Sequence, residues 1–557
     1  MAAISSLSRR VFLKVSGMAA AGVAVASCGS APVFRHGAGS RKSSRVSRQQ
    51  EAFAMEEMTI MQLGEKMRSG ELTARALTKM CLERIEELDK RGPAINAVME
   101  LNPDALSIAD ALDAEQKAKG ARGPLHGIPV LLKDNIATAD KMMTTAGSLA
   151  LLGSIADEDS FVARKLREAG AVILGKTNLS EWANFRSTHS TSGWSSRGGQ
   201  TRNPYALDRN PSGSSSGSAV AVAANLCAVA VGTETNGSII SPAQTTSIVG
   251  IKPTVGLVSR SGIIPIAHSQ DTAGPMSRTV ADAAILLGAL AGVDPRDSVT
   301  ETSRGKSFPD YTQFLDPNGM RGARIGVARN FFGVSERVDK VMESCIQEMK
   351  RLGAEIIDPA NVELAQPVDD AEFKVLLYEF KTDLNKYLER LGPHAPAHSL
   401  KEIMEFNEKG RGKVMPYFGQ EIMKMAEEKG PLTSEEYVKA LETCQRGARK
   451  DGIDATLEKH RLDAIVAPSG GPACLIDWVY GDYSSGGSSS PAAIAGYPNI
   501  TLPAGYVFGL PVGISFFGGA YQEPTLIKLA FALERSMQVR RPPRFPASAD
   551  MSGEEGG

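Results

Sequence analysis

The chain has 557 residues, a net charge of −1 and an isoelectric point of about 6.7. Its length allows one large α/β domain or several smaller ones. Because the charges balance and the body of the chain has no basic block, we expect no nucleic-acid partner. The six cysteines form no C-x-x-C pair, which argues against a zinc site and a disulfide framework: Cys28, Cys81, Cys227, Cys345, Cys444 and Cys474.

Residues 1–28 match an export signal. Ser8–Lys14 fits the twin-arginine pattern, and the apolar run Val15–Ala26 is shorter than the roughly 18–20 residues that a membrane-spanning helix needs. Val25-Ala26-Ser27-Cys28 resembles a lipobox, in which Cys28 becomes the lipidated first residue; the alternative is ordinary cleavage after Ala26. We therefore expect an exported protein, either periplasmic or anchored to the cell envelope by a lipid on Cys28. The polar stretch 29–50, rich in Ser and Arg, predicts a flexible tether.

The body of the chain alternates between helical and strand patterns. Apolar residues between Met58 and Leu88 recur at helical spacing with a break at Ser69-Gly70, which predicts two helices. The strand–helix–strand order of residues 128–175 implies parallel pairing. Further strands are predicted at 128–132, 171–175, 227–232, 323–328, 464–467, 500–503 and 512–516, and helices at 161–169, 219–226, 280–292 and over most of 335–460.

Two serine-rich segments are the strongest chemical signal: Pro211–Ala219 and Gly232–Ile239. A linker is a poor interpretation of the first, because the small apolar run Ala219–Ala224 follows at once. Gly213–Gly217 satisfies G-x-S-x-G, the motif of a nucleophile elbow, which requires a strand immediately before it. The preceding residues are polar and interrupted by prolines, which disfavours a strand and therefore the elbow. No Lys-Ser/Thr pair closes the glycine run, which excludes a phosphate-binding loop. Serines in such turns suit acyl transfer, because backbone N–H groups converge near the hydroxyl.

Lys133 is the candidate base. It follows the apolar run Ile128–Leu132, and a lysine at the end of a buried strand can lose its proton through desolvation; the alternative is an ordinary surface lysine. Cys474 could be a thiol nucleophile or a buried structural cysteine. Six of the seven histidines lie beyond residue 50, and they are too scattered to indicate a competing triad: His126, His189, His268, His394, His398 and His460.

With these motifs the sequence resembles the amidase signature family from about Glu56 to Phe545. The resemblance implies an α/β fold, a single large domain with a mixed, mostly parallel central sheet covered by helices. It places the amidase domain at 51–547, with a core at about 123–282, a helical substrate-side region at about 300–460 and a disordered tail at 548–557. The resemblance is carried by Gly123–Asn135, Gly175–Glu181, Pro211–Ala219, Gly232–Ser238, Val249–Thr254, Asp271–Arg278 and Gly509–Gly513.

The family's roles transfer to matching positions. The resemblance implies that Ser238 is the nucleophile, Ser214 a bridging serine after a cis peptide bond, and Lys133 the base. Backbone N–H groups of Thr235, Asn236 and Gly237, with that of Ser238, would form the oxyanion hole. It implies an acyl-enzyme mechanism on a small-molecule or peptide amide, without a cofactor, a metal or an obligate protein partner.

Three departures suggest a branch of the family. Glu234 stands where Asp is commoner, Asn236 replaces a glycine, and Ile240 replaces an arginine. With Ser192–Tyr205 and Asp271–Met276, these residues look most like the peptide amidase branch, whose members release ammonia from C-terminally amidated peptides. Two alternatives stay open: a glutaminase-type subunit of a tRNA-dependent amidotransferase, and a non-catalytic binding protein of the same fold.

Overall fold

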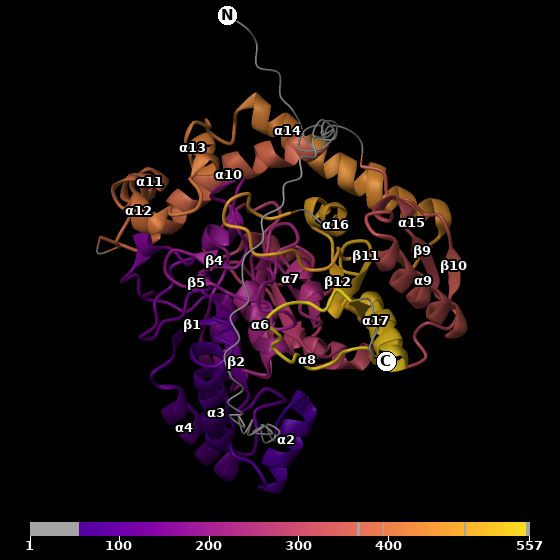
Figure 1. Cartoon of the computed structure of the whole chain (residues 1–557), viewed down its shortest axis with the longest axis horizontal. Coiled ribbons are helices and arrows are strands. Elements are labelled where there is room, and N and C mark those ends of the chain that lie inside the picture. Colours follow the sequence, from indigo (N-terminus) through magenta and orange to yellow (C-terminus); the bar gives the residue numbers. More distant parts are fainter. Residues whose placement is uncertain (1–54, 365–367, 394, 484–485, 553–557) are drawn as a thin grey trace, which may run out of the picture. The chain divides into compact units, whose positions relative to one another are not determined.

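The computed structural model describes residues 55–364, 368–393, 395–483 and 486–552. Glu57–Gly557 form one compact unit, which Figure 1 shows as a sheet surrounded by helices. The expected export signal at 1–28 and the tether at 29–50 lie outside the described residues. Among the helices that are described, none combines the length and apolar character needed to cross a bilayer.

The centre of this unit is a sheet of 11 strands in the order β1-β3-β2-β6-β8-β7-β12-β13-β11-β9-β10. Pairing is parallel for β2 with β3 and β6, and for β9 with β10 and β11; the other neighbours are antiparallel. The strands are β1 Val98–Leu101, β2 Pro129–Lys133, β3 Val172–Thr177, β6 Val229–Glu234, β7 Val249–Lys252, β8 Thr272–Ser277, β9 Arg324–Val327, β10 Glu355–Ile357, β11 Ala464–Pro468, β12 Asn499–Val507 and β13 Leu510–Phe517. A separate two-stranded ribbon joins β4 Trp194–Ser195 to β5 Gly199–Gln200.

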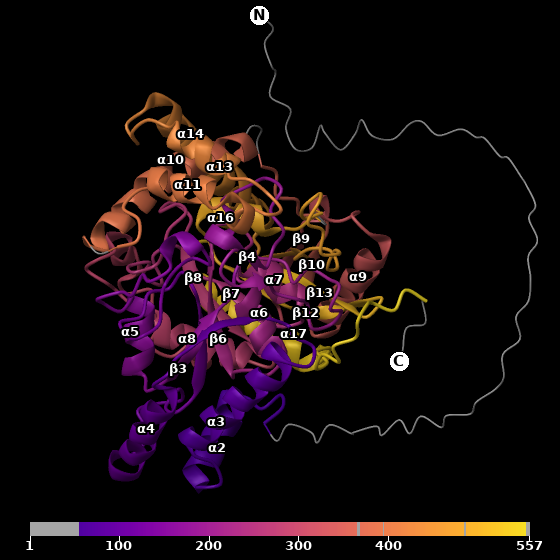
Figure 2. The same ribbon diagram turned by 60° about the vertical axis from the view of Figure 1, so that its left-hand side comes forward.

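Helices cover this sheet, and in both views α2–α4 lie at one end of the unit while α10, α11, α13 and α14 lie at the other (Figure 2). The helices are α2 Ile60–Ser69, α3 Ala74–Arg84, α4 Ala105–Lys119, α5 Phe161–Glu168, α6 Ser216–Ala223, α7 Ile240–Thr245, α8 Val280–Leu290, α9 Glu336–Arg351, α10 Val368–Arg390, α11 Leu400–Lys409, α12 Arg411–Val414, α13 Glu421–Glu427, α14 Glu435–Gln445, α15 Asp454–His460, α16 Ser489–Ala495 and α17 Glu523–Met537.

Local sequence explains where the first helices begin and end. The Thr59 hydroxyl accepts a hydrogen bond from the Gln62 N–H, and the Gln62 side chain accepts one from the Thr59 N–H, so a capping box starts α2. Gly70, with a φ of 80°, ends α2 in the left-handed conformation that glycine adopts most readily. The predicted pair of helices with a break at Ser69-Gly70 is therefore confirmed.

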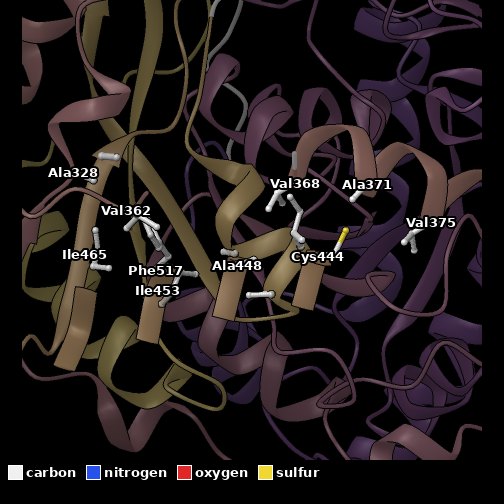
Figure 3. Close-up of a cluster of buried hydrophobic side chains, with 14 of the residues drawn as sticks. Ala328, Val362, Val368, Ala371, Val375, Cys444, Ala448, Ile453, Ile465 and Phe517 are labelled. Carbon is white, nitrogen blue, oxygen red and sulfur yellow. The ribbon is translucent and has the colours of Figure 1, made fainter. Parts of the chain in front are cut away.

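Two apolar cores connect the helices to the sheet. One joins β11 and β13 to α10 and α14, with Ile465, Phe517, Val375 and Cys444 among its members (Figure 3). The other packs α10, α11 and α13 against the segments around Trp182 and Ile264. The helical region is thereby fixed against residues next to the serine-rich motifs.

The observed sheet agrees with the expected single domain on a mixed sheet, although its centre is more antiparallel than expected. The reason is that β12 and β13 form a hairpin, and β8 runs antiparallel between β6 and β7. All predicted strands are present within a few residues, whereas β1, β7, β8 and β10 were not predicted. The expected helical region at 300–460 also contributes β9 and β10 to the sheet edge.

Candidate active site

The candidate site lies at the carboxyl ends of two neighbouring parallel strands. β2 ends at Lys133 and β6 ends at Glu234, and the register pairs Leu132 with Val231. The carboxyl edge of parallel strands is where α/β proteins place their ligands. Lys133 and the segment that continues into Ser238 therefore meet at one edge of the sheet.

Lys133 makes three close polar contacts. Its Nζ lies 2.7 Å from Ser214 Oγ, 2.9 Å from Thr233 Oγ1 and 3.2 Å from the Thr233 carbonyl oxygen. A neutral amine has two N–H groups and one lone pair, and a carbonyl oxygen can only accept. When Lys133 is neutral, both N–H groups can go to Thr233 and the lone pair can face the Ser214 hydroxyl.

Burial makes that neutral form accessible. The Lys133 side chain is fully buried, and loss of hydration lowers its pKa to about 7, while the nearby carboxylates of Asp271 and Glu234 act in the opposite direction. A lysine with this pKa is a competent proton acceptor near neutral pH. The interpretation of Lys133 as a surface lysine is wrong.

Ser214 follows a cis peptide bond after Gly213, as the resemblance implies. A Cβ on Gly213 would lie 2.2 Å from Ser180 Oγ, so a side chain there would displace the Ser180 hydroxyl. The Ser214 carbonyl accepts from the Ser180 N–H at 3.2 Å. These contacts hold the Ser214 hydroxyl toward Lys133. No strand leads into this turn, as its polar, proline-broken approach predicts.

Ser238 lies beside this arrangement, on the loop between β6 and α7. Its carbonyl accepts from the Ser215 N–H at 3.1 Å, which ties the two serine-rich motifs together. Ser238 is buried, with 8% of the residue exposed. No hydrogen bond joins its hydroxyl to Ser214 Oγ or to another described residue. Catalytic hydrogen bonds of substrate-free enzymes are often long and shorten when substrate binds.

The loop before Ser238 presents backbone N–H groups. Within the described part of the chain, those of Asn236, Gly237 and Ser238 have no hydrogen-bond acceptor. Gly237 has a φ of 80°, and a Cβ there would lie 3.0 Å from Ser241 Oγ. Unpaired N–H groups of successive residues are the donors that an oxyanion hole requires. Thr235 lies in the same loop, and its hydroxyl donates to Asp271 Oδ1 at 2.5 Å.

Glu234, one of the departures from the common family pattern, has a positioning role that sequence reasoning did not identify. Its Oε2 accepts from the Ile239 N–H at 2.7 Å and from the Ile240 N–H at 3.0 Å. The carboxylate therefore fixes the chain immediately after Ser238. Ile240 itself is fully buried and apolar.

The side chain of Asn236 is held by two distant helices. Asn236 Nδ2 donates to Glu372 Oε1 on α10 at 2.8 Å, and its Oδ1 accepts from Ser489 Oγ on α16 at 2.9 Å. Gln270 Nε2 donates to the same Glu372 oxygen at 2.9 Å and to the Thr235 carbonyl at 3.3 Å. Glu372 thus clamps the start of the candidate oxyanion loop, directly at Asn236 and through Gln270 at Thr235, and burial raises the pKa of its carboxyl.

Two cavities flank the site. The first, of about 190 Å³, reaches Asn135, Thr233 and Thr235, which surround Lys133 and the oxyanion loop. The second, of about 220 Å³, reaches Gly213 and Ser241 beside the two serine motifs. Thr235 lines the first cavity and Ser241 the second, so each cavity adjoins the loop that carries Ser238 and is a candidate for substrate binding.

The competing nucleophiles do not fit. Burial raises the pKa of the Cys474 thiol, which disfavours the reactive thiolate. No hydrogen bond connects a described histidine to Lys133, Ser214 or Ser238. His268, for example, is bonded through Nδ1 to Asp383 at 2.7 Å, on α10.

Sequence reasoning missed four residues that complete this geometry: Asn135, Thr233, Gln270 and Glu372. Asn135 Nδ2 donates to Thr233 Oγ1 at 3.0 Å and so orients the hydroxyl that contacts Lys133. Asn135 and Thr233 lie within motifs that carry the resemblance, so a role for them in the site could have been predicted from the sequence. Glu372 lies 136 residues from Asn236, and no local pattern signals it.

A serine amidase is the class of protein that this fold and site define, and comparison with known proteins agrees. The sequence model of the amidase family matches residues 76–527. Native peptide amidase from Stenotrophomonas maltophilia, a solved structure, is 49% identical with a TM-score of 0.84, over 88% of this chain and 99% of that one.

Two curated relatives extend the comparison. A protein of Arabidopsis thaliana named a probable amidase is 43% identical over 89% of this chain and 93% of its own length. A glutamyl-tRNA(Gln) amidotransferase subunit of Halorhodospira halophila is 36% identical over 85% of this chain and 96% of its own length. The chain therefore belongs to the amidase family and is a hydrolase of amides.

The pKa of Lys133 predicts the pH dependence of activity. We expect kcat/KM for an amide substrate to rise along a single limb near pH 7 and then level off, because the neutral amine exists above its pKa. Initial rates of ammonia release between about pH 5 and 9 test this. Lys133→Ala should lower kcat/KM by at least about 10²-fold and abolish the limb.

Asp271→Asn is the control for the assignment of that limb. Asp271 itself has a pKa raised to about 6, and its charge raises the pKa of Lys133. Removing the charge should shift the limb to lower pH without abolishing it. A limb that survives Lys133→Ala, or disappears in Asp271→Asn, would contradict the assignment to Lys133.

The Glu372 clamp predicts a second result. Glu372→Ala should lower kcat roughly 10- to 100-fold with little change in KM, because a displaced oxyanion loop affects the transition state more than substrate binding. Glu372→Gln should retain most activity, since its Oε1 can still accept from both amides. Steady-state kinetics measure both effects.

A double-mutant cycle with Asn236→Gly separates this role from general stability. If Glu372 acts through Asn236, then Glu372→Ala should cost less in the Asn236→Gly background. Fully additive effects, or a loss of kcat that only follows a fall in the melting temperature, would refute the clamp.

Proposed function

We propose that this amidase releases ammonia from C-terminally amidated peptides through Ser238, Ser214 and Lys133. The 2.7 Å contact between Lys133 Nζ and Ser214 Oγ, with Ser238 on the adjoining loop, is the observation that carries the catalytic assignment. The 49% identity to a peptide amidase supports the substrate class.

The proposed reaction has two stages. Neutral Lys133 accepts the proton of Ser214 as Ser214 takes that of Ser238, and Ser238 Oγ attacks the amide carbonyl carbon. The N–H groups of Thr235, Asn236, Gly237 and Ser238 stabilise the oxyanion, each typically worth ~10²–10³ in rate.

The first stage ends when the proton returns through Ser214 to the leaving nitrogen and the C–N bond breaks. Ammonia departs, and the acyl group stays bound to Ser238 as an ester. In the second stage a water molecule gives its proton to the same relay and attacks the ester. The peptide acid is released, and Ser238 and Lys133 return to their starting protonation states.

Ammonia release from a panel of amides tests this function. We expect peptide amides to be hydrolysed with higher kcat/KM than simple aliphatic amides or glutamine, and Ser238→Ala to lose at least about 10⁴-fold. Hydrolysis of glutamine alone would favour the amidotransferase alternative. Full activity of Ser238→Ala, or failure of Ser238 in the folded protein to react with a fluorophosphonate probe, would refute the mechanism.

We also propose that the enzyme is exported and reaches the periplasm or the envelope. The support is the sequence of residues 1–28, with Arg9-Arg10 and Cys28 in their expected contexts. Expression of the full chain in a bacterium with a twin-arginine pathway should give a processed enzyme in the envelope fraction.

Matched variants resolve the two export steps. Replacing Arg9 and Arg10 together by lysine should leave the precursor in the cytoplasm, and Cys28→Ala should abolish labelling by a radioactive fatty acid. Equal cytoplasmic retention of the parent and the lysine variant would contradict export. Envelope location without fatty-acid labelling of the parent would favour ordinary cleavage.

A further inference from the structure

The described residues expose an unusual concentration of apolar side chains on one loop. Of the 14 exposed large hydrophobic residues, five lie between 475 and 483, and Val479, Tyr480 and Tyr483 are 71–81% exposed. Clustered apolar surface of this kind marks interaction sites on soluble proteins. The five residues are Leu475, Trp478, Val479, Tyr480 and Tyr483, and we call them the aromatic loop.

The backbone of the aromatic loop is firmly attached at its start. The Ile476 N–H donates to the Asp208 carbonyl at 3.0 Å. The Asp477 carbonyl accepts from Thr191 Oγ1 at 2.7 Å, and Asp477 Oδ1 accepts from the Val479 N–H at 2.8 Å. The exposed side chains are thus displayed by an ordered turn.

The end of the loop is attached to the segment that leads to the serine motif. Asp482 accepts from the Ser192 N–H at 3.0 Å and from Asn210 Nδ2 at 2.6 Å. Trp478 stacks on Tyr417, with ring centroids 4.8 Å apart and planes at 14°. The aromatic loop therefore has a fixed position relative to Ser214.

The second cavity runs between Tyr483 of this loop and residues close to the two catalytic serines in the chain. It is lined by Cys474 and Tyr483 at the loop, and by Gly213 and Ser241 at the serine motifs. Asn184 lines it as well, and its Oδ1 is a buried acceptor without a hydrogen-bond partner among the described residues. A buried acceptor of this kind can take a hydrogen bond from water or from a bound ligand, and the backbone N–H of a peptide is a suitable donor.

We propose that the aromatic loop binds apolar side chains of the peptide amide, at residues preceding the amidated end, while the second cavity holds the peptide backbone. This rests on the proposed function and adds the preferred substrate: a peptide amide with bulky apolar residues upstream. An extended peptide covers about 3.3–3.6 Å per residue, so longer substrates should reach the loop and a single amino-acid amide should not.

Three substrates with a common alaninamide end test the proposal: N-acetyl-alaninamide, a tetrapeptide amide with Leu and Phe upstream, and one with Ser and Gly upstream. The unaltered enzyme should prefer the apolar to the polar tetrapeptide by roughly tenfold or more in kcat/KM, because burial of a large apolar side chain stabilises the bound substrate. The preference should lie mainly in KM.

The variant of choice combines Val479→Ser with Tyr480→Ser. Both side chains are highly exposed, so the change removes apolar surface while keeping the turn around Asp477. We expect it to reduce the ratio of the two tetrapeptide kcat/KM values about tenfold. Leu152→Ala, equally apolar but outside the loop and 52% exposed, is the matched control and should keep the ratio.

Each other outcome overturns the proposal in a distinguishable way. If the parent hydrolyses peptide amides and the ratio is unchanged in the double variant, the proposed role of the aromatic loop is refuted while the proposed function stands. An equal loss with N-acetyl-alaninamide means that the loop acts on the catalytic residues and not on the substrate. If the parent hydrolyses no peptide amide, the proposed function fails too. If the variant loses only binding to phosphatidylcholine–phosphatidylglycerol vesicles, the loop contacts membranes instead.

Discussion

The burial of Lys133 at the end of β2 is the constraint on which the site depends. An amine without access to water is costly to protonate, so its pKa falls to about 7 and its lone pair becomes available at neutral pH. The same burial requires that each N–H group find a partner in the protein. Thr233 provides both acceptors, and Ser214 occupies the remaining direction. The proposed proton relay is the consequence of satisfying a buried lysine.

The surrounding architecture keeps this arrangement compact. Parallel pairing of β2 with β6 sets the end of one strand beside the start of the loop to Ser238. Close approach of α6 depends on small residues, since a Cβ on Gly217 would lie 2.2 Å from the Ala97 carbonyl oxygen. Helices α10 and α16 then reach the oxyanion loop through Asn236. The helical region therefore takes part in positioning the loop, in addition to covering the sheet.

Much of this could be predicted from sequence, because the decisive patterns are local. The apolar run before Lys133 predicted a buried strand, and the small residues at 219–226 predicted a close-packed helix, which begins three residues earlier in the structure, at Ser216. By contrast, β8 contains Gly274 and Pro275, which weaken any strand assignment, and it is a strand because β6 and β7 pair with it on both sides. The Glu372 clamp was equally unpredictable, since its partners are distant in sequence and meet only in the folded chain. The aromatic loop, an ordinary mixture of residues in the sequence, becomes distinctive only through its exposure.

The most direct test of the central claim is the protonation state of Lys133 itself. Carbon-13 labelling of the lysine side chains allows the Lys133 ε-carbon to be followed by NMR during a pH titration, with Lys133→Arg to assign the signal. The account predicts a titration midpoint near the pKa of about 7. A midpoint close to about 10.4, the value of an ordinary lysine, would show that Lys133 stays charged at neutral pH and would contradict its role as the base.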